Sequence, residues 1–298
     1  MAGAAPKPEE ISASRPDKVM FPEAGLTKAD LVDYYRRIAP AMLPYLKDRA
    51  ITLRRFPDGI GEEGFFQKNT PDYFPDWIPR IRQKKEGGTV DYVGIDSAAA
   101  LAWVADQGTI ELHAALSRAG HPGRPDQIIF DLDPPDDDFS KVQEVAAALR
   151  DLCEAKEIPV FVKTTGSRGL HVLIPVDDSR EGDFDEARGW ARNLAERVAE
   201  KHDTLATIEQ RKDKRGGRVF VDYLRNAYGQ TAVAPWSLRA RAQAPVATPL
   251  DWAEALAADM KPDKYTLGNV FRRLPQKDDP WAGIWKNAPA LADLRKAL

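Results

Sequence analysis

The sequence predicts an α+β protein, and three observations support this class. Short apolar runs of strand length, such as residues 51–53 and 128–133, are separated by turn-forming residues. Later stretches place apolar residues at the i, i+3, i+4, i+7 spacing of a helix that buries one face. The 298 residues, 43% of them hydrophobic, can also enclose a sizeable core without cross-links.

The composition excludes several classes of protein. A charged fraction of 30% and a net charge of −3 are ordinary for a globular protein and exclude a collagen, a coiled coil and a wholly disordered chain. The single cysteine, Cys153, excludes a disulfide framework and favours a reducing compartment. The longest apolar run, residues 98–105, is too short to cross a bilayer, so we expect a soluble, cytoplasmic protein with no membrane partner.

The first part of the chain predicts one helix and several short strands. Residues 1–13 are rich in Ala, Pro and Glu, and we expect them to be disordered. Thr27 should open a helix that ends at Pro44, because apolar residues recur between them at helical spacing. Short strands and loops should follow at residues 51–53, 64–67, 90–95 and 98–105.

The middle of the chain alternates strand and helix signals. Strands are expected at residues 128–133, 160–162, 170–174 and 219–223, and helices around residues 142–153 and 184–198. This β-α-β-β-α-β order is that of the ferredoxin-like split unit, which places the first strand beside the third and fourth. We expect a single domain over residues 14–298, comprising an N-terminal module (14–115), a core (116–248) and C-terminal helices (249–298) with a tail packed on the body.

Three aspartates mark the candidate reaction site. Asp131 and Asp133 are two apart on one strand and share a face, and Asp222 lies on a strand expected beside it. Such hard oxygen ligands suit two Mn²⁺ or Mg²⁺ ions and phosphoryl or nucleotidyl transfer. The alternatives are aspartates that cap backbone amides at a strand end and an Asp222 paired with Arg225. Residues 136–138 fit a solvated loop and a helix N-cap instead.

The segment KTTGSRGLHVLIP predicts a hairpin turn next to these aspartates. Gly166 and Gly169 allow a tight turn whose N–H groups could bind an anion. Ser167, Arg168 and His171 could then bind a phosphate, the alternative being an ordinary hairpin with a structural histidine. A zinc site is excluded, because the four histidines and one cysteine lack ligand spacing.

Aromatic and basic residues elsewhere could contact nucleic acid. Phe65 and Phe66 could stack on bases, although one of the two is expected in the core. Arg239 suits triphosphate oxygens because a guanidinium binds them through two N–H groups. Lys214 and Arg215 belong to a basic segment expected over the template or primer backbone, the alternative being a solvated loop.

Taken together, the motifs resemble a known family. FDLDP, TTGSRGLHVLIP and VFVDY followed by TAVAPWSLRAR resemble, in this order, the polymerase domain of bacterial ligase D, of the archaeo-eukaryotic primase superfamily. The N-terminal segments PDKVMFPEAGLTKADLVDYY, GFFQKN and IDSAAALAWVADQGTIELH are similar to the same family. The resemblance covers about residues 12–275.

The resemblance implies a primase-polymerase fold, with the split unit as a catalytic core packed on an N-terminal α/β module. It implies a template-directed polymerase that fills gaps and extends DNA ends in non-homologous end joining, with a preference for ribonucleotides and two Mn²⁺ (or Mg²⁺) ions. The implied partners are DNA gaps or ends bearing a 5′-phosphate, nucleoside triphosphates, a Ku-like end-binding protein and a DNA ligase. The implied location is a bacterial or archaeal cytoplasm, in association with the nucleoid.

The resemblance also implies roles for particular residues. The implied metal ligands are Asp131, Asp133 and Asp222, and the implied nucleotide-binding set is Arg54, His113, Ser167, Arg168, His171 and Arg239. Phe65 and Phe66 match the pair that packs on template bases. Lys18 and Lys28 match lysines that hold a 5′-phosphate, and Lys28 begins a helix whose free N–H groups attract an anion.

Two departures and several alternatives stay open. The segment after ELH lacks an expected Trp, and TTGSRG replaces TSGSKG. No ligase or nuclease motif accompanies the polymerase motifs, so we expect either a stand-alone gap-filling enzyme or primase, or one domain of a larger ligase. A metal-dependent nuclease could use the same carboxylates, and a non-catalytic DNA-end binder would need only the lysines and the Phe pair.

Overall fold

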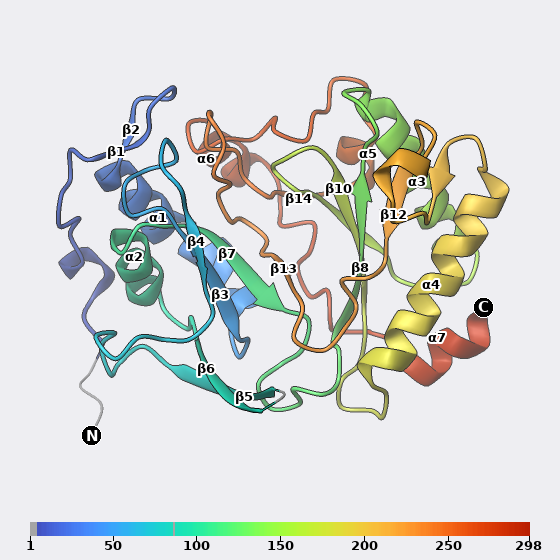
Figure 1. Ribbon diagram of the computed structural model, residues 1–298, viewed down its shortest axis with the longest axis horizontal. Helices are drawn as coiled ribbons and strands as arrows, with labels where there is room; N and C mark the ends of the chain where they lie inside the picture. Colours follow the sequence, from blue (N-terminus) through green and yellow to red (C-terminus); the bar gives the residue numbers. More distant parts are fainter. Residues whose placement is uncertain (1–4, 86) are drawn as a thin grey trace. The chain divides into compact units, whose positions relative to one another are not determined.

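The computed structural model describes residues 5–85 and 87–298, which form two compact units. Unit 1 contains the chain up to Ala115 together with Thr231–Ala247 and Tyr265–Arg273. Unit 2 contains Leu116–Gln230, Thr248–Lys264 and Leu274–Leu298. The chain therefore returns to unit 1 after completing most of unit 2, and Figure 1 shows one returning strand, β13, beside β7.

Unit 1 is built on a sheet with the strand order β13-β7-β3-β6-β5. Its strands are β3 (Ile51–Arg55), β5 (Arg80–Lys85), β6 (Gly88–Val93), β7 (Thr109–Ala115) and β13 (Thr231–Val233). The short strand β4 (Phe65–Gln67) pairs with β3, and β1 (Val19–Phe21) pairs with β2 (Leu26–Thr27). These strands confirm the three predicted around residues 51, 64 and 90.

Two helices of unit 1 differ from the sequence prediction. Helix α1 (Lys28–Leu46) starts at the predicted Thr27 cap but continues past Pro44, because burial of Tyr45 and Leu46 offsets the hydrogen bond that the proline cannot make. Residues 98–105, predicted as strand and loop, form most of helix α2 (Ala98–Asp106). Their alanines favour a helix, and nearly uniform burial removes the periodicity that would have revealed it.

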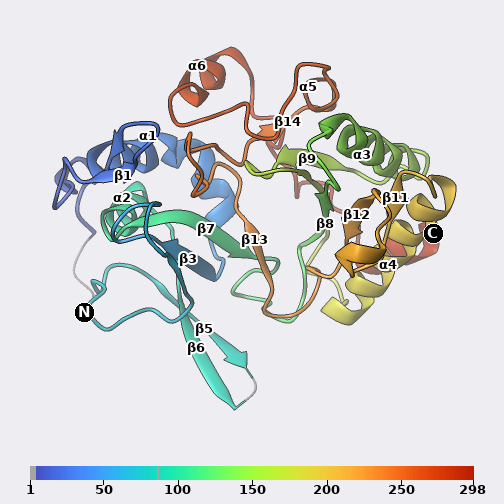
Figure 2. The same cartoon turned by 45° about the horizontal axis from the view of Figure 1, so that its top comes forward.

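Unit 2 contains the predicted split unit. Its sheet has the order β11-β12-β8-β10-β9-β14 and is formed by β8 (Gln127–Asp133), β9 (Phe161–Thr164), β10 (Leu170–Pro175), β11 (Ala206–Thr207), β12 (Val219–Asp222) and β14 (Pro249–Leu250). The first strand, β8, lies between the third, β10, and the fourth, β12, as predicted. Helices α3 (Phe139–Glu154) and α4 (Phe184–Lys201) pack on each other and on this sheet (Figure 2).

The C-terminal region confirms the packed tail but not the predicted helix lengths. The helix expected over residues 251–260 is the short α5 (Trp252–Ala255), and α6 (Val270–Arg273) is the second short helix. Within unit 2, Trp281 is buried and donates to Val162 O, and Trp285 donates to Asp126 O. Helix α7 (Leu291–Ala297) packs on α4, where Trp190 donates to Leu294 O.

The N-terminal segment is better defined than expected. Residues 5–13, expected to be disordered, include the 3₁₀ helix η1 (Pro8–Glu10), and Arg36 donates to the carbonyls of Pro8 and Ile11. Residues 1–4 lie outside the described residues. In the part of the chain that is described, no helix has the length and apolarity needed to span a membrane.

Candidate functional site

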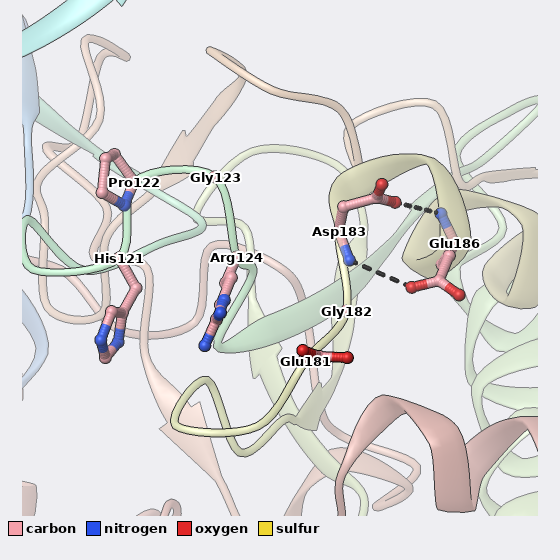
Figure 3. A pocket seen from close by; sticks show the side chains of 8 residues that line it. All are labelled: His121, Pro122, Gly123, Arg124, Glu181, Gly182, Asp183 and Glu186. Carbon is pink, nitrogen blue, oxygen red and sulfur yellow. Dashed lines mark hydrogen bonds between the residues drawn. The ribbon is translucent and has the colours of Figure 1, made fainter.

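A pocket of ≈ 530 Å³ in unit 2 contains none of the predicted site residues (Figure 3). Its lining mixes the cationic Arg124 with acidic residues such as Glu181 and Asp183. The N-terminus of α4 faces it, but Asp183 caps the amide of Glu186 while Glu186 accepts from the amide of Asp183. Since the helix end is already satisfied by its own side chains, this pocket offers little to an anionic ligand.

The three predicted aspartates lie together in unit 2. Asp222, at the end of β12, is directly opposite Asp131 of β8 in the antiparallel register. Asp133 ends β8 two residues after Asp131, so all three carboxylates occur at one end of the β8–β12 pair. The predicted convergence of the two strands is therefore present in the fold.

The charges of these aspartates oppose one another. Partial withdrawal from water, together with the neighbouring Asp131 and Asp222, raises the pKa of Asp133 to about 6. Burial and the charge of Asp131 likewise raise the pKa of Asp222. A cation between carboxylates that repel one another would stabilise their ionised forms.

Asp131 differs because His171 and Arg225 both lie within 4 Å of its carboxylate. Burial alone would raise its pKa, but His171 and Arg225 favour the charged form and lower the pKa of Asp131 to about 2. His171 is opposite Asp131 in the β8–β10 register, with its Nε2 3.4 Å from Asp131 Oδ1. Arg225 Nε is 3.8 Å from Asp131 Oδ2, so the alternative pairing of Arg225 with Asp222 is not what the structure shows.

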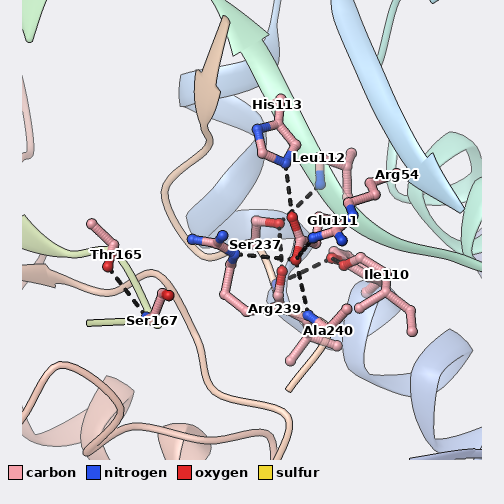
Figure 4. A network of polar contacts seen from close by, with 12 residues as sticks. Arg54, Ile110, Glu111, Leu112, His113, Thr165, Ser167, Ser237, Arg239 and Ala240 are labelled. Carbon is pink, nitrogen blue, oxygen red and sulfur yellow. Dashed lines mark hydrogen bonds and ion pairs between the residues drawn. The ribbon is translucent and has the colours of Figure 1, made fainter. Parts of the chain in front are cut away.

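The β9–β10 turn is closed by its own hydrogen bonds. Thr165 N donates to Gly169 O, and Thr165 Oγ1 accepts from the amides of Ser167 and Gly169 (Figure 4). The amides of Ser167 and Gly169 are therefore not free for an anion, because the Thr165 hydroxyl already accepts them. Phosphate binding by the rest of the turn stays a prediction. The Arg168 side chain is half exposed and contacts the loop that follows β8, where its Nη2 lies 3.3 Å from Asp136 O.

Gly169 is required by a close approach of two strands. A Cβ at this position would lie 1.9 Å from the carbonyl oxygen of Leu132, the residue between Asp131 and Asp133. Gly166 instead has a positive φ of 63°, the left-handed region that glycine adopts without strain. The glycines of the motif thus serve the docking of the turn on β8, next to which His171 of β10 lies opposite Asp131.

Asn226 supports the aspartate site, and no sequence pattern singled it out. Its side chain is 1% exposed, accepts from Ile129 N at 2.8 Å and donates to the carbonyls of Ile129 and Tyr223. These bonds fix the turn after β12 against β8. This turn carries Arg225, whose Nε is 3.8 Å from Asp131 Oδ2.

A second cluster of predicted residues lies in unit 1, around Glu111 of β7. Glu111 Oε1 is 3.1 Å from Arg54 Nη1, 3.2 Å from Arg239 Nε and 3.0 Å from the amide of Ala240, and Oε2 is 2.9 Å from His113 Nε2 (Figure 4). Burial alone would raise the pKa of Glu111, but the contacts with His113 and Arg239 outweigh this effect and lower the pKa to about 2. The three predicted nucleotide-binding residues Arg54, His113 and Arg239 are therefore joined by a carboxylate that we did not predict. A lone Glu in an apolar strand, two residues before His113, was the available signal.

The segment that carries Arg239 is firmly attached within unit 1. Tyr34 Oη donates to Trp236 O at 2.7 Å, and Tyr35 Oη accepts from Leu238 N. Ser237 Oγ accepts from Leu112 N on β7. Trp236 has a φ of +65°, an unfavourable conformation for a bulky residue that these surrounding bonds maintain.

Phe65 and Phe66 are both exposed, at 46% and 57%. The expectation that one of them belongs to the core is wrong, because β4 lies at the edge of the sheet and pairs only with β3. The Phe66 ring stands edge-on to the His113 ring at 5.5 Å and has the Arg54 guanidinium 5.4 Å from its centre. Phe66 thus adjoins the Glu111 cluster while presenting a face to solvent.

The two predicted phosphate-binding lysines have carboxylate partners within unit 1. Lys18 pairs with Asp58. Lys28 is 4% exposed and donates to Asp106 O at 2.6 Å and to Ser14 Oγ, with Asp106 Oδ1 at 3.3 Å. The expectation of a free helix N-terminus at Lys28 is wrong, because Thr27 and Asp30 form a capping box there.

The two candidate residues of the basic segment before β12, Lys214 and Arg215, have different surroundings. Lys214 is exposed at the end of the 3₁₀ helix η2 (Lys212–Lys214). Arg215 donates to the carbonyls of Glu209 and Gln210 and lies 4.0 Å from the centre of the Phe220 ring. Its charge lowers the pKa values of Asp133 and Asp222, against the larger upward effect of burial and like charge. Arg215 therefore belongs electrostatically to the aspartate cluster.

Comparison with known proteins gives a consistent result. The family description "LigD, primase-polymerase domain" matches residues 27–281. The chain is 34% identical over 286 residues to the multifunctional non-homologous end joining protein LigD of Mycolicibacterium smegmatis, covering 94% of this chain and 37% of that protein. It is 31% identical to the bifunctional LigD of Bacillus subtilis, covering 91% of this chain and 43% of that protein. The chain thus spans less than half the length of these curated relatives.

A solved structure is similar over almost its whole length. The polymerase domain of Mycobacterium tuberculosis ligase D in complex with DNA superposes with a TM-score of 0.87 at 33% identity, covering 94% of this chain and 99% of that one. The α+β architecture, the three ordered motifs and the match over residues 27–281 agree. The chain belongs to the LigD primase-polymerase domain family.

Proposed function

We propose that this protein is a template-directed nucleotidyltransferase that fills gaps and extends DNA ends in non-homologous end joining. The observation that carries the proposal is the pairing of Asp222 with Asp131 in the β8–β12 register, with Asp133 beside them. Membership in the LigD primase-polymerase domain family favours nucleotide addition over other reactions of a carboxylate cluster. The match to a polymerase domain in complex with DNA supports DNA as the substrate.

The donor set fits a hard divalent cation such as Mn²⁺ or Mg²⁺. Among residues 5–85 and 87–298, no group of three or more His, Cys, Asp or Glu side chains could hold a metal ion as it stands. A hard cation of this kind takes only one or two carboxylates and completes its shell with water and substrate phosphate. The raised pKa of Asp133 reflects the repulsion that such a cation would relieve.

Two bound ions would lower the pKa of the primer 3′-hydroxyl and stabilise the charge that develops on the α-phosphate and pyrophosphate. Asp131, Asp133 and Asp222 would hold the ions. His171, whose pKa burial and the Lys163 cation lower to about 4, would stay neutral at pH 7 and keep Asp131 oriented through its Nε2. No side-chain general base is required.

The other predicted residues would each bind a different part of the substrates. The incoming nucleotide would contact Arg54, His113, Ser167, Arg168, His171 and Arg239. Exposed Phe65 and Phe66 would stack on template bases. Lys214 and Arg215 would lie along the nucleic-acid backbone. Lys18 and Lys28 would bind a 5′-phosphate by exchanging their partners Asp58 and Asp106 for it.

The decisive experiment is primer extension on a gapped duplex with a 5′-phosphate, with and without Mn²⁺. Asp131→Asn, Asp133→Asn and Asp222→Asn should each reduce extension by at least about a hundredfold, because each removes a transition-state interaction. Asp137→Asn is the matched control, since Asp137 is fully exposed in the adjacent loop. Near-wild-type extension by any of the three variants would remove that residue from the metal site.

The same assay separates the alternatives. Primer shortening instead of lengthening would indicate a nuclease, and DNA binding without either change would indicate an end binder. Comparison of ribo- and deoxynucleoside triphosphates tests the proposed ribonucleotide preference. Addition of a Ku-like end-binding protein and a DNA ligase to a two-ended substrate tests the proposed end-joining partners.

A further inference from the structure

Glu111 is a buried carboxylate of unit 1 with four polar partners. Its carboxylate is 2% exposed and contacts Arg54, Arg239, His113 and the amide of Ala240. A buried carboxylate is costly unless hydrogen bonds or ion pairs satisfy its oxygens. Glu111 has hydrogen bonds with Arg54, His113 and the amide of Ala240, and an ion pair with Arg239. The contacts come from β3, from β7 and from the segment after β13, so one side chain joins three separate pieces of chain (Figure 4).

The geometry of the sheet places these partners around Glu111. Arg54 of β3 is its cross-strand partner in the β3–β7 register, and His113 lies two residues along β7 on the same face. The segment holding Arg239 is fixed by Ser237 and by the two buried tyrosines, Tyr34 and Tyr35. The cluster is therefore pre-arranged.

The cluster around Glu111 has a net positive charge that can attract an anionic ligand. One carboxylate faces two guanidinium groups, so the cluster has a net charge of at least +1. The Arg54 side chain is 35% exposed and the Arg239 side chain 17%, whereas Glu111 is sealed from solvent. The accessible surface of the cluster is thus positive, which suits a polyanion such as a triphosphate.

Glu111 also determines which nitrogen of His113 carries a proton. The carboxylate is acceptor-only when ionised, so His113 Nε2, 2.9 Å from Oε2, must be the donor. Neutral His113 is therefore the Nε2–H tautomer. A Gln at position 111 would retain an acceptor for the arginines but could present an N–H group to His113, which favours the opposite tautomer.

We infer that Glu111 is a positioning residue that fixes Arg54, His113 and Arg239 as one array for the triphosphate of the incoming nucleotide. The inference rests on the proposed function. Glu111 itself would not contact the substrate. Its effect is exerted entirely through the side chains that it orients.

The test uses Glu111→Gln in the full chain, with Asp33→Asn as the matched control. Asp33 also pairs with two arginines of unit 1, Arg36 and Arg37, but lies at the surface of α1. Long-range ¹⁵N–¹H NMR of the four histidines should show the Nε2–H tautomer of His113 in the wild type and the Nδ1–H tautomer in Glu111→Gln. Asp33→Asn should leave the wild-type tautomer unchanged.

Primer-extension kinetics supply the functional readout. Glu111→Gln should raise KM for the nucleoside triphosphate about tenfold with kcat changed less than about threefold, since binding geometry is lost but the reacting groups remain. An unchanged KM overturns the inference, even where the tautomer switches, because Glu111 would then serve stability alone. An unchanged tautomer overturns it as well.

Failure of the proposed function would look different. If the wild type adds no nucleotide to primed DNA with Mn²⁺ or Mg²⁺, the proposed function fails and the array has no nucleotide to bind. If the wild type adds nucleotide and Glu111→Gln matches it in KM, only the positioning role fails. The conservative variant keeps a hydrogen-bond acceptor beside Arg54 and Arg239, which Glu111→Ala would remove.

Discussion

Asp131 of β8 and Asp222 of β12 face each other across an antiparallel strand pair, although 90 residues separate them in the sequence. The two strands belong to opposite ends of the split unit and become neighbours only because β8 is central. Like charges placed so closely destabilise a fold unless a cation accompanies them. The register of this pair is therefore best explained by a function rather than by stability.

The first prediction concerns this repulsion. Asp133→Asn should raise the Tm in EDTA by about 2–4 °C, because a carboxylate repelled by Asp131 and Asp222 is neutralised. Mn²⁺ should then stabilise the wild type by mass action but stabilise Asp133→Asn less. Thermal unfolding with and without Mn²⁺ measures both effects, with Asp137→Asn as the control. A lower Tm for Asp133→Asn in EDTA would contradict the repulsion.

The second prediction concerns the contact between the β9–β10 turn and β8. Gly169→Ala should cost about 3 kcal/mol, because its Cβ would meet the Leu132 backbone oxygen and no side-chain rotation could relieve the clash. Gly189→Ala, in the interior of α4 with open space around it, should instead gain about 0.5–1 kcal/mol. Urea unfolding of both variants checks the contrast. Equal stabilities would show that the turn does not dock on β8.

The third prediction concerns the turn that carries Arg225. Asn226→Asp should destabilise the protein by about 2–4 kcal/mol, because an aspartate cannot donate to the buried carbonyls of Ile129 and Tyr223. Asn193→Asp, on the exposed side of α4, should change stability by less than about 0.5 kcal/mol. Denaturant midpoints distinguish the two. A neutral effect of Asn226→Asp would mean that Asn226 does not hold the turn.

The fourth prediction concerns the pH dependence of stability. The folded state holds the pKa of Glu111 at about 2, below the ordinary value of 4.5, so the ionised group stabilises the fold above about pH 4.5. Glu111→Gln should therefore be less stable than the wild type by about 2 kcal/mol at pH 7. That difference should persist at pH 5.5 and narrow as the pH falls from 4.5 towards 2. Urea unfolding at pH 7, 5.5, 4 and 3 measures it, and a difference independent of pH would exclude an ionised Glu111 as its source.

The sequence alone determined the split unit, because each of its strands and helices has a local signature. The apolar run at residues 128–133 and the helical spacing of residues 142–153 and 184–198 are visible without any tertiary contact. Alternation along β8 also placed Asp131 and Asp133 on one face. The motifs then predicted the family that the comparisons show.

Tertiary structure decided what depended on the surroundings of a residue. Helix α2 was missed because burial on all sides hides a helical period, and α1 passes Pro44 because packing outweighs a lost hydrogen bond. Lys28 and Phe66 have ordinary sequence contexts, yet one is buried against Asp106 and the other is exposed. Glu111 and Asn226 contact residues far along the chain, so their roles follow from register and turn geometry. A local sequence pattern does not encode those long-range contacts, because they exist only once the strands have paired.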